Sequence, residues 1–272
     1  MDKNLDQLHK TLVEILDFVV SVCEENNLEY CLAYGSALGA YRHKGFIPWD
    51  DDMDIAMPRN DYEKFLRIMQ SKYKDGLFRI QTEKTEKKYF LSFAKVRKQN
   101  TVFIESIAEE IYSDNGIYID IFPLDGVFNA ETFSFRIKRK YINYLKHVLK
   151  LQACPALYQK KEGQLKYYVD RILSFPNLFI SNKKLLAILN KAMISKQSVS
   201  KAPYIAQYDE SNAGGVMRRD VYFPFGKCEF EGKQYSVPGK IEEFLRTQYG
   251  ETYIELPPEE KRATHKPIEL KF

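Results

Sequence analysis

The chain has 272 residues, of which 44% are hydrophobic and 29% charged, a composition typical of an ordered soluble protein and unlike that of a disordered one. The 41 Lys and Arg residues exceed the 37 Asp and Glu residues by a net charge of +4, which is too small to indicate nucleic-acid binding. The longest uncharged stretch in the apolar middle, residues 172–182, is shorter than the roughly 20 residues that a membrane-spanning helix needs, so we expect no transmembrane segment.

The first six residues and the cysteines bear on the compartment. Charges stand where a secretory signal peptide needs apolar residues, which predicts a cytoplasmic protein. The four cysteines form no CxxC pair and have no metal-finger spacing with the histidines. We therefore interpret them as small buried apolar residues.

In the first half of the chain, predicted strands alternate with predicted helices. Apolar residues recur at helical spacing over 5–25, and a strand at 29–34 runs into a tight turn at Gly35-Ser36. Further strands are predicted at 52–57, 78–82, 90–97 and 116–122, and helices at 37–42 and 61–73.

After Gly126 the pattern changes to long helical segments, which predicts a helical addition to an α+β (mixed) fold. Helices are predicted at 130–152, 162–174, 182–195 and 240–249, and short strands at 228–230 and 233–236. We divide the chain into a core at 1–126, a basic helical region at 127–202, and a C-terminal region at 203–272 that packs back on the core. Residues 132–208 hold 15 basic and 2 acidic residues, so the middle is basic and the flanks are acidic.

The densest cluster of charge is acidic: Asp50, Asp51, Asp52 and Asp54 fall within five positions beside apolar residues. On a strand, Asp52 and Asp54 share a face, and Asp50 joins them if the strand begins early. Paired carboxylates form a hard-oxygen site suited to Mg²⁺ or Mn²⁺. The alternative is a solvated acidic turn before a strand.

A second carboxylate stands out because Asp120 is the single charge within the apolar segment 117–122. Burying an unpaired carboxylate costs several kcal/mol as an order of magnitude, so we expect Asp120 to be paired, protonated or bound to a metal. The alternatives are an exposed face of an edge strand and a buried salt bridge to a lysine.

The strand-to-helix turn at Gly35-Ser36 offers free backbone N–H groups at a helix N-terminus, which favours phosphate binding. A glycine turn, a carboxylate pair on the next strand and a lone carboxylate on a later strand follow one another in the order used by the nucleotidyltransferase fold.

Residues 35–55 closely resemble the signature of the LicD family of phosphotransferases, which is related to fukutin. Further similar segments are 95–97 before Asn100-Thr101, 119–126, and 249–250 leading into 256–262. The resemblance spans most of the chain except the helical middle.

This resemblance implies a nucleotidyltransferase-like catalytic core that holds Mg²⁺ or Mn²⁺ on Asp52, Asp54 and Asp120. It implies transfer of phosphocholine from CDP-choline to a sugar hydroxyl of a cell-surface glycan precursor, of the teichoic acid or lipopolysaccharide type, with release of CMP. Asp120 would complete a second metal position or take the proton of the attacking hydroxyl. The residues that we expect to bind the donor are Gly35, Ser36, Arg42, Lys44, Asp51, Lys95 and Arg97.

Choline is a quaternary ammonium group, which proteins hold over aromatic faces. Candidates for such a cage cluster in the sequence: Tyr204, Tyr208, Tyr222, Phe223 and Phe225. A ribitol- or glycerol-phosphate donor would need hydroxyl partners instead and stays open.

Two other readings start from the acidic cluster alone. A metal-dependent glycosyltransferase could use Asp52 and Asp54, but this reading leaves Asp120 unexplained. A calcium-binding EF-hand loop would begin at Asp50, but Ile55 stands where the loop requires glycine and Asp61 where it uses Glu.

The basic middle predicts peripheral contact with the anionic inner face of the membrane, where a lipid-linked glycan acceptor would be met. The residues behind this prediction are Arg136, Lys138, Arg139 and Lys140, beside Ile137, Tyr141, Tyr144 and Leu145. The alternative is a helix packed through its apolar face with solvated lysines.

Overall fold

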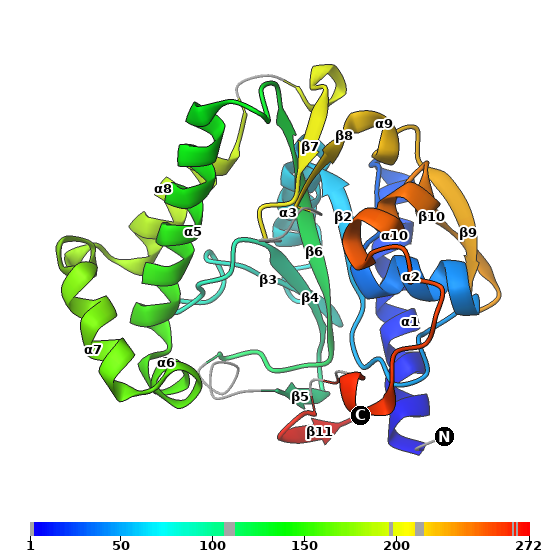
Figure 1. Ribbon diagram of the computed structural model, residues 1–272. Helices are drawn as coiled ribbons and strands as arrows, with labels where there is room; N and C mark the ends of the chain where they lie inside the picture. Colours follow the sequence, from blue (N-terminus) through cyan, green and yellow to red (C-terminus); the bar gives the residue numbers. More distant parts are fainter. Residues whose placement is uncertain (1–2, 106–111, 196–197, 210–214, 263, 265) are drawn as a thin grey trace.

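The computed structural model describes residues 3–105, 112–195, 198–209, 215–262, 264 and 266–272 and shows an α+β fold built on one mixed sheet (Figure 1). The helices are α1 (Lys3–Glu25), α2 (Tyr34–His43), α3 (Arg59–Lys72), α5 (Phe133–Ala153), α6 (Pro155–Glu162), α7 (Gln164–Leu173), α8 (Asn182–Met193), α9 (Arg219–Tyr222) and α10 (Ile241–Tyr249), with 3-10 turns η1 (Phe175–Phe179), η2 (Val199–Lys201) and η4 (Glu259–Lys261). The strands are β1 (Cys31–Leu32), β2 (Asp54–Pro58), β3 (Phe78–Gln81), β4 (Ala94–Lys98), β5 (Val102–Ile104), β6 (Tyr118–Val127), β7 (Tyr204–Ala206), β8 (Val216–Arg218), β9 (Gly226–Phe230), β10 (Lys233–Val237) and β11 (Glu269–Lys271).

The main sheet has the order β1-β2-β6-β4-β3, and β7 and β8 extend it from the far half of β6. Strands β2 and β6 are parallel, whereas β4 runs antiparallel to β6 on its other side. In this register Asp120 lies between Asp54 on one neighbour and Lys95 on the other. The hydrogen-bonded pairing of the sheet therefore brings together three charged residues that are distant in the sequence.

Helices α1 and α3 cover one face of the sheet, behind it in Figure 1. The buried stripe of α1 includes Leu8, Leu12, Ile15 and Val19, which is the helical spacing predicted from the sequence. Side chains of β6 alternate between the two faces of the sheet. Ile119 and Ile121 are buried on the face covered by the helices, which is the apolar core, and Asp120 points to the opposite, open face.

The helical middle forms a second apolar cluster outside the main core. Leu145 and Leu149 of α5 pack with Leu185 and Leu189 of α8, and Tyr208 after β7 joins them. Strand β6 continues to Val127, past the boundary predicted at residue 126, so the division into three regions stays a prediction.

Several predicted elements differ from the structure at their ends. The strand predicted at 29–34 is reduced to β1, because the chain already turns into α2 at Tyr34, where φ is 43°. The strand predicted at 52–57 begins two residues later, at Asp54. All four cysteines are free, and Cys228 is half-buried where burial was expected. None of the helices in the described ranges combines the length and apolar character needed to cross a membrane.

Candidate active site

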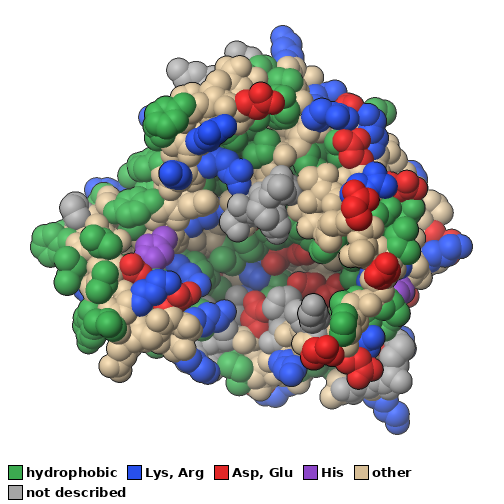
Figure 2. Space-filling model, viewed as in Figure 1, with side chains coloured by type: hydrophobic (Ala, Val, Ile, Leu, Met, Phe, Trp, Pro, Cys, Tyr) green, Lys and Arg blue, Asp and Glu red, His purple; other side chains and the backbone are tan. Residues whose placement is uncertain are grey.

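The open face of the main sheet carries the predicted carboxylates. Asp54 is the first residue of β2, and its N–H donates to Ser36 Oγ over 2.9 Å. The N–H of Asp120 donates to the carbonyl of Met53 over 2.9 Å, which ties β6 to the residue before Asp54. Main-chain hydrogen bonds therefore hold both carboxylates in place. Figure 2 shows this face hollowed near its centre, with acidic and basic side chains on the floor.

The electrostatics of Asp54 show that the carboxylates gather. Burial raises the pKa of Asp54 well above the usual range, and the charges of Asp52, Asp120 and Asp50 raise it further. Lys95 acts in the opposite direction. The charges of three further carboxylates therefore act on Asp54.

Asp120 is paired with a buried lysine. Lys95 Nζ lies 3.1 Å from Asp120 Oδ1, with the lysine side chain 3% exposed. The ammonium group also lies 3.4 Å from the centroid of the Tyr118 ring. Burial raises the pKa of Asp120 to about 7, although Lys95 favours the ionised form. The salt bridge weighed as an alternative for Asp120 is therefore present, and it lies beside Asp54 rather than apart from it.

The acidic loop before β2 departs from the prediction in one respect. Asp52 precedes the strand, so the argument that Asp52 and Asp54 share a strand face is wrong, although their charges still interact. Asp51 is buried and accepts from the N–H of Lys266 over 3.3 Å. An EF-hand loop is not formed, because β2 and the start of α3 occupy most of residues 50–61.

The turn predicted at Gly35-Ser36 is the first turn of α2. Ser36 is 5% exposed, and its hydroxyl accepts the N–H of Asp54, so it joins the helix to β2. A Cβ at Gly35 would lie 2.8 Å from Asp50 Oδ2. Glycine at this position therefore allows the acidic loop to approach the start of the helix.

The structure does not bring Arg42 and Lys44 to the carboxylates. Arg42 lies near the opposite end of α2, and its Nη1 donates to the carbonyls of Tyr253 and Glu255 over 2.9 and 3.0 Å. The Lys44 side chain is 73% exposed and lies 3.6 Å from Glu229. Arg42 thus anchors the C-terminal segment, and Lys44 is a solvated surface residue.

Arg97 is close to Lys95 in the sequence but serves the framework. It is fully buried, and it donates to Gln81 Oε1 and to the carbonyl of Gly116, both over 2.7 Å. Its guanidinium carbon lies 4.5 Å from the centroid of the Tyr118 ring. Of the basic residues predicted to bind the donor, Lys95 is therefore the one that lies against a predicted carboxylate.

Aromatic residues that the sequence analysis did not select lie next to these charges. Phe122 shares the face of Asp120, because the two are separated by one residue on β6. Its ring centroid lies 4.3 Å from that of Phe93 and 5.0 Å from that of Tyr34. The i, i+2 spacing of Asp120 and Phe122 was visible in the sequence, but the approach of Tyr34 and Phe93 depends on the tertiary fold.

Three of the five rings predicted to form an aromatic cage are buried, whereas Tyr204 and Phe225 are half-buried. Tyr222 is 1% exposed and donates to Gln207 Oε1 over 3.0 Å. Phe223 and Tyr208 are also buried, in the main core and in the helical cluster. These rings are packing residues, since each is enclosed by apolar neighbours.

The carboxylates of Asp52, Asp54 and Asp120 are chemically suited to bind a divalent cation. Carboxylate oxygens are the ligands that Mg²⁺ and Mn²⁺ prefer, and the charges of Asp52, Asp120 and Asp50 act on the buried Asp54. Among the described residues, no group of three or more His, Cys, Asp or Glu side chains is placed so that it could hold a metal ion. The chemistry of Asp52, Asp54 and Asp120 fits such a cation, but their side chains would have to move to converge on one.

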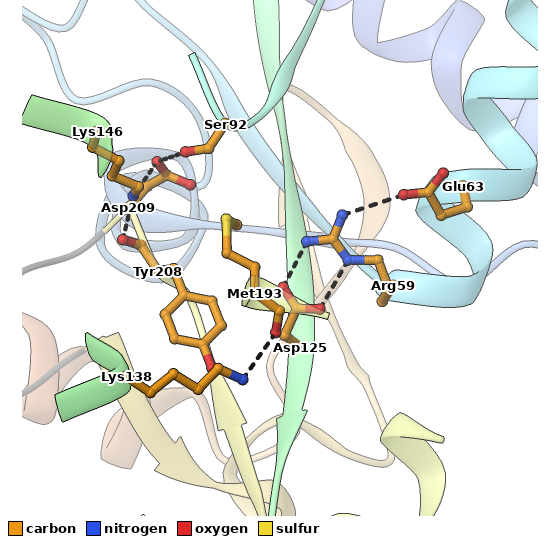
Figure 3. Close-up of polar contacts among 9 residues, drawn as sticks. All are labelled: Arg59, Glu63, Ser92, Asp125, Lys138, Lys146, Met193, Tyr208 and Asp209. Carbon is orange, nitrogen blue, oxygen red and sulfur yellow. Dashed lines mark hydrogen bonds and ion pairs between the residues drawn. The ribbon is translucent and has the colours of Figure 1, made fainter. Parts of the chain in front are cut away.

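The far half of β6 carries a second buried charge, shown in Figure 3. Arg59 Nε and Nη2 donate to the two carboxylate oxygens of Asp125 over 2.8 and 2.6 Å. Nearby, Asp209 accepts from Lys146 of α5 over 2.7 Å and from Ser92 over 2.5 Å. These contacts join the helical middle to the sheet, so the end of β6 is fixed on both sides.

A cavity of about 550 Å³ lies apart from the carboxylates. Its lining includes Lys74, Arg79, Lys84 and Glu86, and none of the residues predicted for the active site. We place the chemistry at the carboxylates, because volume alone supplies no reacting group.

Comparison with known proteins gives one family match and several similar proteins. Residues 27–155 match the family described as LicD/FKTN/FKRP, nucleotidyltransferase domain. Over 258 residues, 93% of this chain and 92% of the relative, the chain is 28% identical to the lipopolysaccharide cholinephosphotransferase LicD of Haemophilus influenzae. It is also 34% identical over 74 residues to an uncharacterized protein of Rickettsia typhi, covering 27% of this chain and 24% of that protein. An uncharacterized protein of Rickettsia prowazekii is 27% identical over 118 residues, which cover 40% of this chain and 44% of that one.

Proposed function

Since this chain carries a LicD-type nucleotidyltransferase domain, we propose that it is a transferase that moves phosphocholine from CDP-choline to a sugar hydroxyl of a cell-surface glycan precursor. The observation that carries the proposal is the register of β2 and β6, which sets Asp54 beside Asp120 on the open face of the sheet. The activity named for the Haemophilus relative is the same class of transfer. Acceptors of the teichoic acid or lipopolysaccharide type both present the required hydroxyl.

In the proposed reaction the sugar hydroxyl attacks the phosphorus that bears choline. A new P–O bond forms to the sugar, the P–O bond to CMP breaks, and the hydroxyl proton is taken by a base. Asp120 suits this role because its pKa of about 7 lies near neutral pH, where a base is most effective. Lys95 positions that carboxylate and favours its ionised form, against the effect of burial.

We include Mg²⁺ or Mn²⁺ as a proposed cofactor that Asp52, Asp54 and Asp120 would hold. Such an ion neutralises the negative oxygens of a diphosphate during displacement. Its binding would also relieve the repulsion that raises the pKa of Asp54.

Choline as the transferred group is supported by the aromatic residues beside Asp120. Tyr34 and Phe93 are half-buried and contact Phe122, so ring surface lies near the carboxylates. A quaternary ammonium group is held by aromatic faces, whereas ribitol or glycerol phosphate would need hydrogen-bonding partners for its hydroxyls. These rings favour choline over the alternative donors.

A donor screen tests the proposal. CDP-choline, CDP-ribitol, CDP-glycerol and UDP-sugars are incubated with enzyme and a glycan acceptor, and the released nucleotide is measured by chromatography. We expect CMP from CDP-choline alone, no release after treatment with EDTA, and recovery when Mg²⁺ or Mn²⁺ is restored. Release of UDP would support a glycosyltransferase instead, and pyrophosphate with the nucleotide left on the acceptor would mean nucleotidyl transfer.

Gly35→Ala should lower turnover by about 10-fold, because a methyl group 2.8 Å from Asp50 Oδ2 would displace the Asp50 carboxylate. The matched control is Gly76→Ala, whose nearest neighbour would lie at 3.4 Å, away from the carboxylates. Both variants should show native circular dichroism. Full activity of the Gly35→Ala variant would mean that the position of Asp50 does not affect catalysis.

A further inference from the structure

Helix α7 turns its apolar face to solvent. Leu165, Tyr168, Val169 and Ile172 follow the i, i+3, i+4, i+7 spacing of one helix face and are 81%, 59%, 44% and 73% exposed. The residue that α7 buries is Tyr167. In an ordinary surface helix an apolar stripe of this kind faces the core. Because the stripe of α7 faces solvent, we expect it to bind another surface.

The apolar surface continues past the end of the helix. Leu173, Phe175 and Phe179 are 70%, 60% and 77% exposed, and the two phenylalanine rings meet edge to face with centroids 5.1 Å apart. We call these three residues and the four of α7 the apolar ridge. A contiguous patch of this kind marks an interaction site, unlike single exposed apolar residues.

Lysines border the apolar ridge on two sides. Lys160 and Lys161 end α6, and Lys183 and Lys184 lie in the first turn of α8, all four exposed. None of the four forms an ion pair within the part of the chain that the structure describes. Figure 1 places α6 and α7 at the outer edge of the helical region. The same edge in Figure 2 shows apolar and basic side chains interleaved.

We propose that the apolar ridge docks this protein on an anionic membrane surface. Exposed Leu, Ile, Phe and Tyr side chains enter the boundary between headgroups and acyl chains, and the bordering lysines lie against anionic headgroups. Charge complementarity selects this occupant, since the basic border would repel a second copy of the same surface.

Helix α5, on which the sequence analysis based membrane contact, is less suited to it. Leu145 is 2% exposed, and Tyr144 Oη accepts from Asn177 Nδ2 over 2.7 Å. Lys138 is half-buried and donates to the carbonyl of Met193. Part of that helix therefore packs through its apolar residues, as the alternative held, although Ile137 and Tyr141 are exposed. Our proposal places the membrane contact on α7 and η1 instead.

The test is co-sedimentation of the full chain with vesicles of phosphatidylcholine alone and of phosphatidylcholine mixed with phosphatidylglycerol. We expect binding to the mixed vesicles only, weakened by added salt. Combined Leu165→Gln, Ile172→Gln and Phe179→Gln should lower the partition coefficient at least about tenfold. Replacing the four bordering lysines with Gln should lower it about fivefold for each lysine, the equivalent of about 1 kcal/mol each.

The matched control replaces three exposed apolar residues elsewhere, Leu77, Ile254 and Ile268, with Gln. This control variant should bind vesicles as strongly as the parent protein does. All variants should release nucleotide at the parental rate when the acceptor is water-soluble. This second assay separates a loss of vesicle binding from a loss of activity. Recovery of the parent in the supernatant with every vesicle would overturn the proposal. If the parent protein does not bind vesicles, and light scattering shows a dimer for the parent but a monomer for the ridge variant, the apolar ridge is a contact between copies of the chain instead.

Discussion

Asp54→Asn should lower turnover at least about a thousandfold, because Asn is a weaker ligand for the proposed cation, whose charge would stabilise the reacting phosphate by several kcal/mol as an order of magnitude. Asn keeps the shape of the side chain and leaves the backbone N–H bonded to Ser36. Asp52→Asn should have an effect of the same kind, since its charge reaches Asp54. Turnover is measured as CMP release, and Asp75→Asn, a change to an exposed carboxylate, is the matched control.

The same variant should not unfold more easily. The folded protein holds the pKa of Asp54 above its unfolded value, so the ionised group destabilises the fold as pH rises past the ordinary carboxyl range. Replacing it with neutral Asn removes that penalty, and the Tm in EDTA at neutral pH should stay equal or rise. Retained turnover in both the Asp52 and Asp54 variants would remove these residues from the site.

Asp125→Ala should destabilise the protein by about 3–5 kcal/mol, because it removes both oxygens that accept from the buried Arg59 guanidinium and leaves it the partly exposed Glu63 carboxylate, 3.3 Å away. Both side chains are largely buried, at 1% exposed for Asp125 and 7% for Arg59, and they share two hydrogen bonds. Urea unfolding monitored by circular dichroism measures the change. Replacing both partners, as Arg59→Met with Asp125→Leu, should recover much of the loss, since neither charge then remains buried.

The control for this pair is the exposed contact of Arg218 with Asp220, in which both side chains are more than half exposed. Asp220→Asn should leave the urea midpoint unchanged within error, because solvent screens the pair. If Asp125→Ala were equally silent, the Arg59–Asp125 contact would not be a determinant of stability.

Local pattern in the sequence was enough to single out Asp54 and Asp120, but not to show how they meet. A run of carboxylates beside apolar residues and a lone charge in an apolar strand are both visible along the chain. Their adjacency comes from the parallel pairing of β2 with β6, across more than sixty residues, and residue pattern does not state which strands pair. The start of β2 at Asp54 was missed for the same reason, since pairing partners set where a strand begins.

The basic residues show a second limit of sequence reasoning. Lys95 and Arg97 have the same local setting on β4, yet one lies against Asp120 and the other against Gln81 and Gly116. Residue type gives the charge, and the tertiary fold assigns the partner. The exposure of the apolar face of α7 could not be predicted either, because the spacing of its apolar residues predicts a helix but does not show which face is buried.

The pairing of β6 with β7 also has a consequence for how this scaffold can be varied. Val127 and Tyr204 are cross-strand neighbours, so the chain leaves the sheet and returns to it at the same point, and residues 128–203 form one oversized hairpin connection. The entropy of closing such a connection rises only slowly with its length. The length of the helical excursion can therefore change at little entropic cost while Val127 and Tyr204 stay paired, provided that contacts such as that of Lys146 with Asp209 are kept.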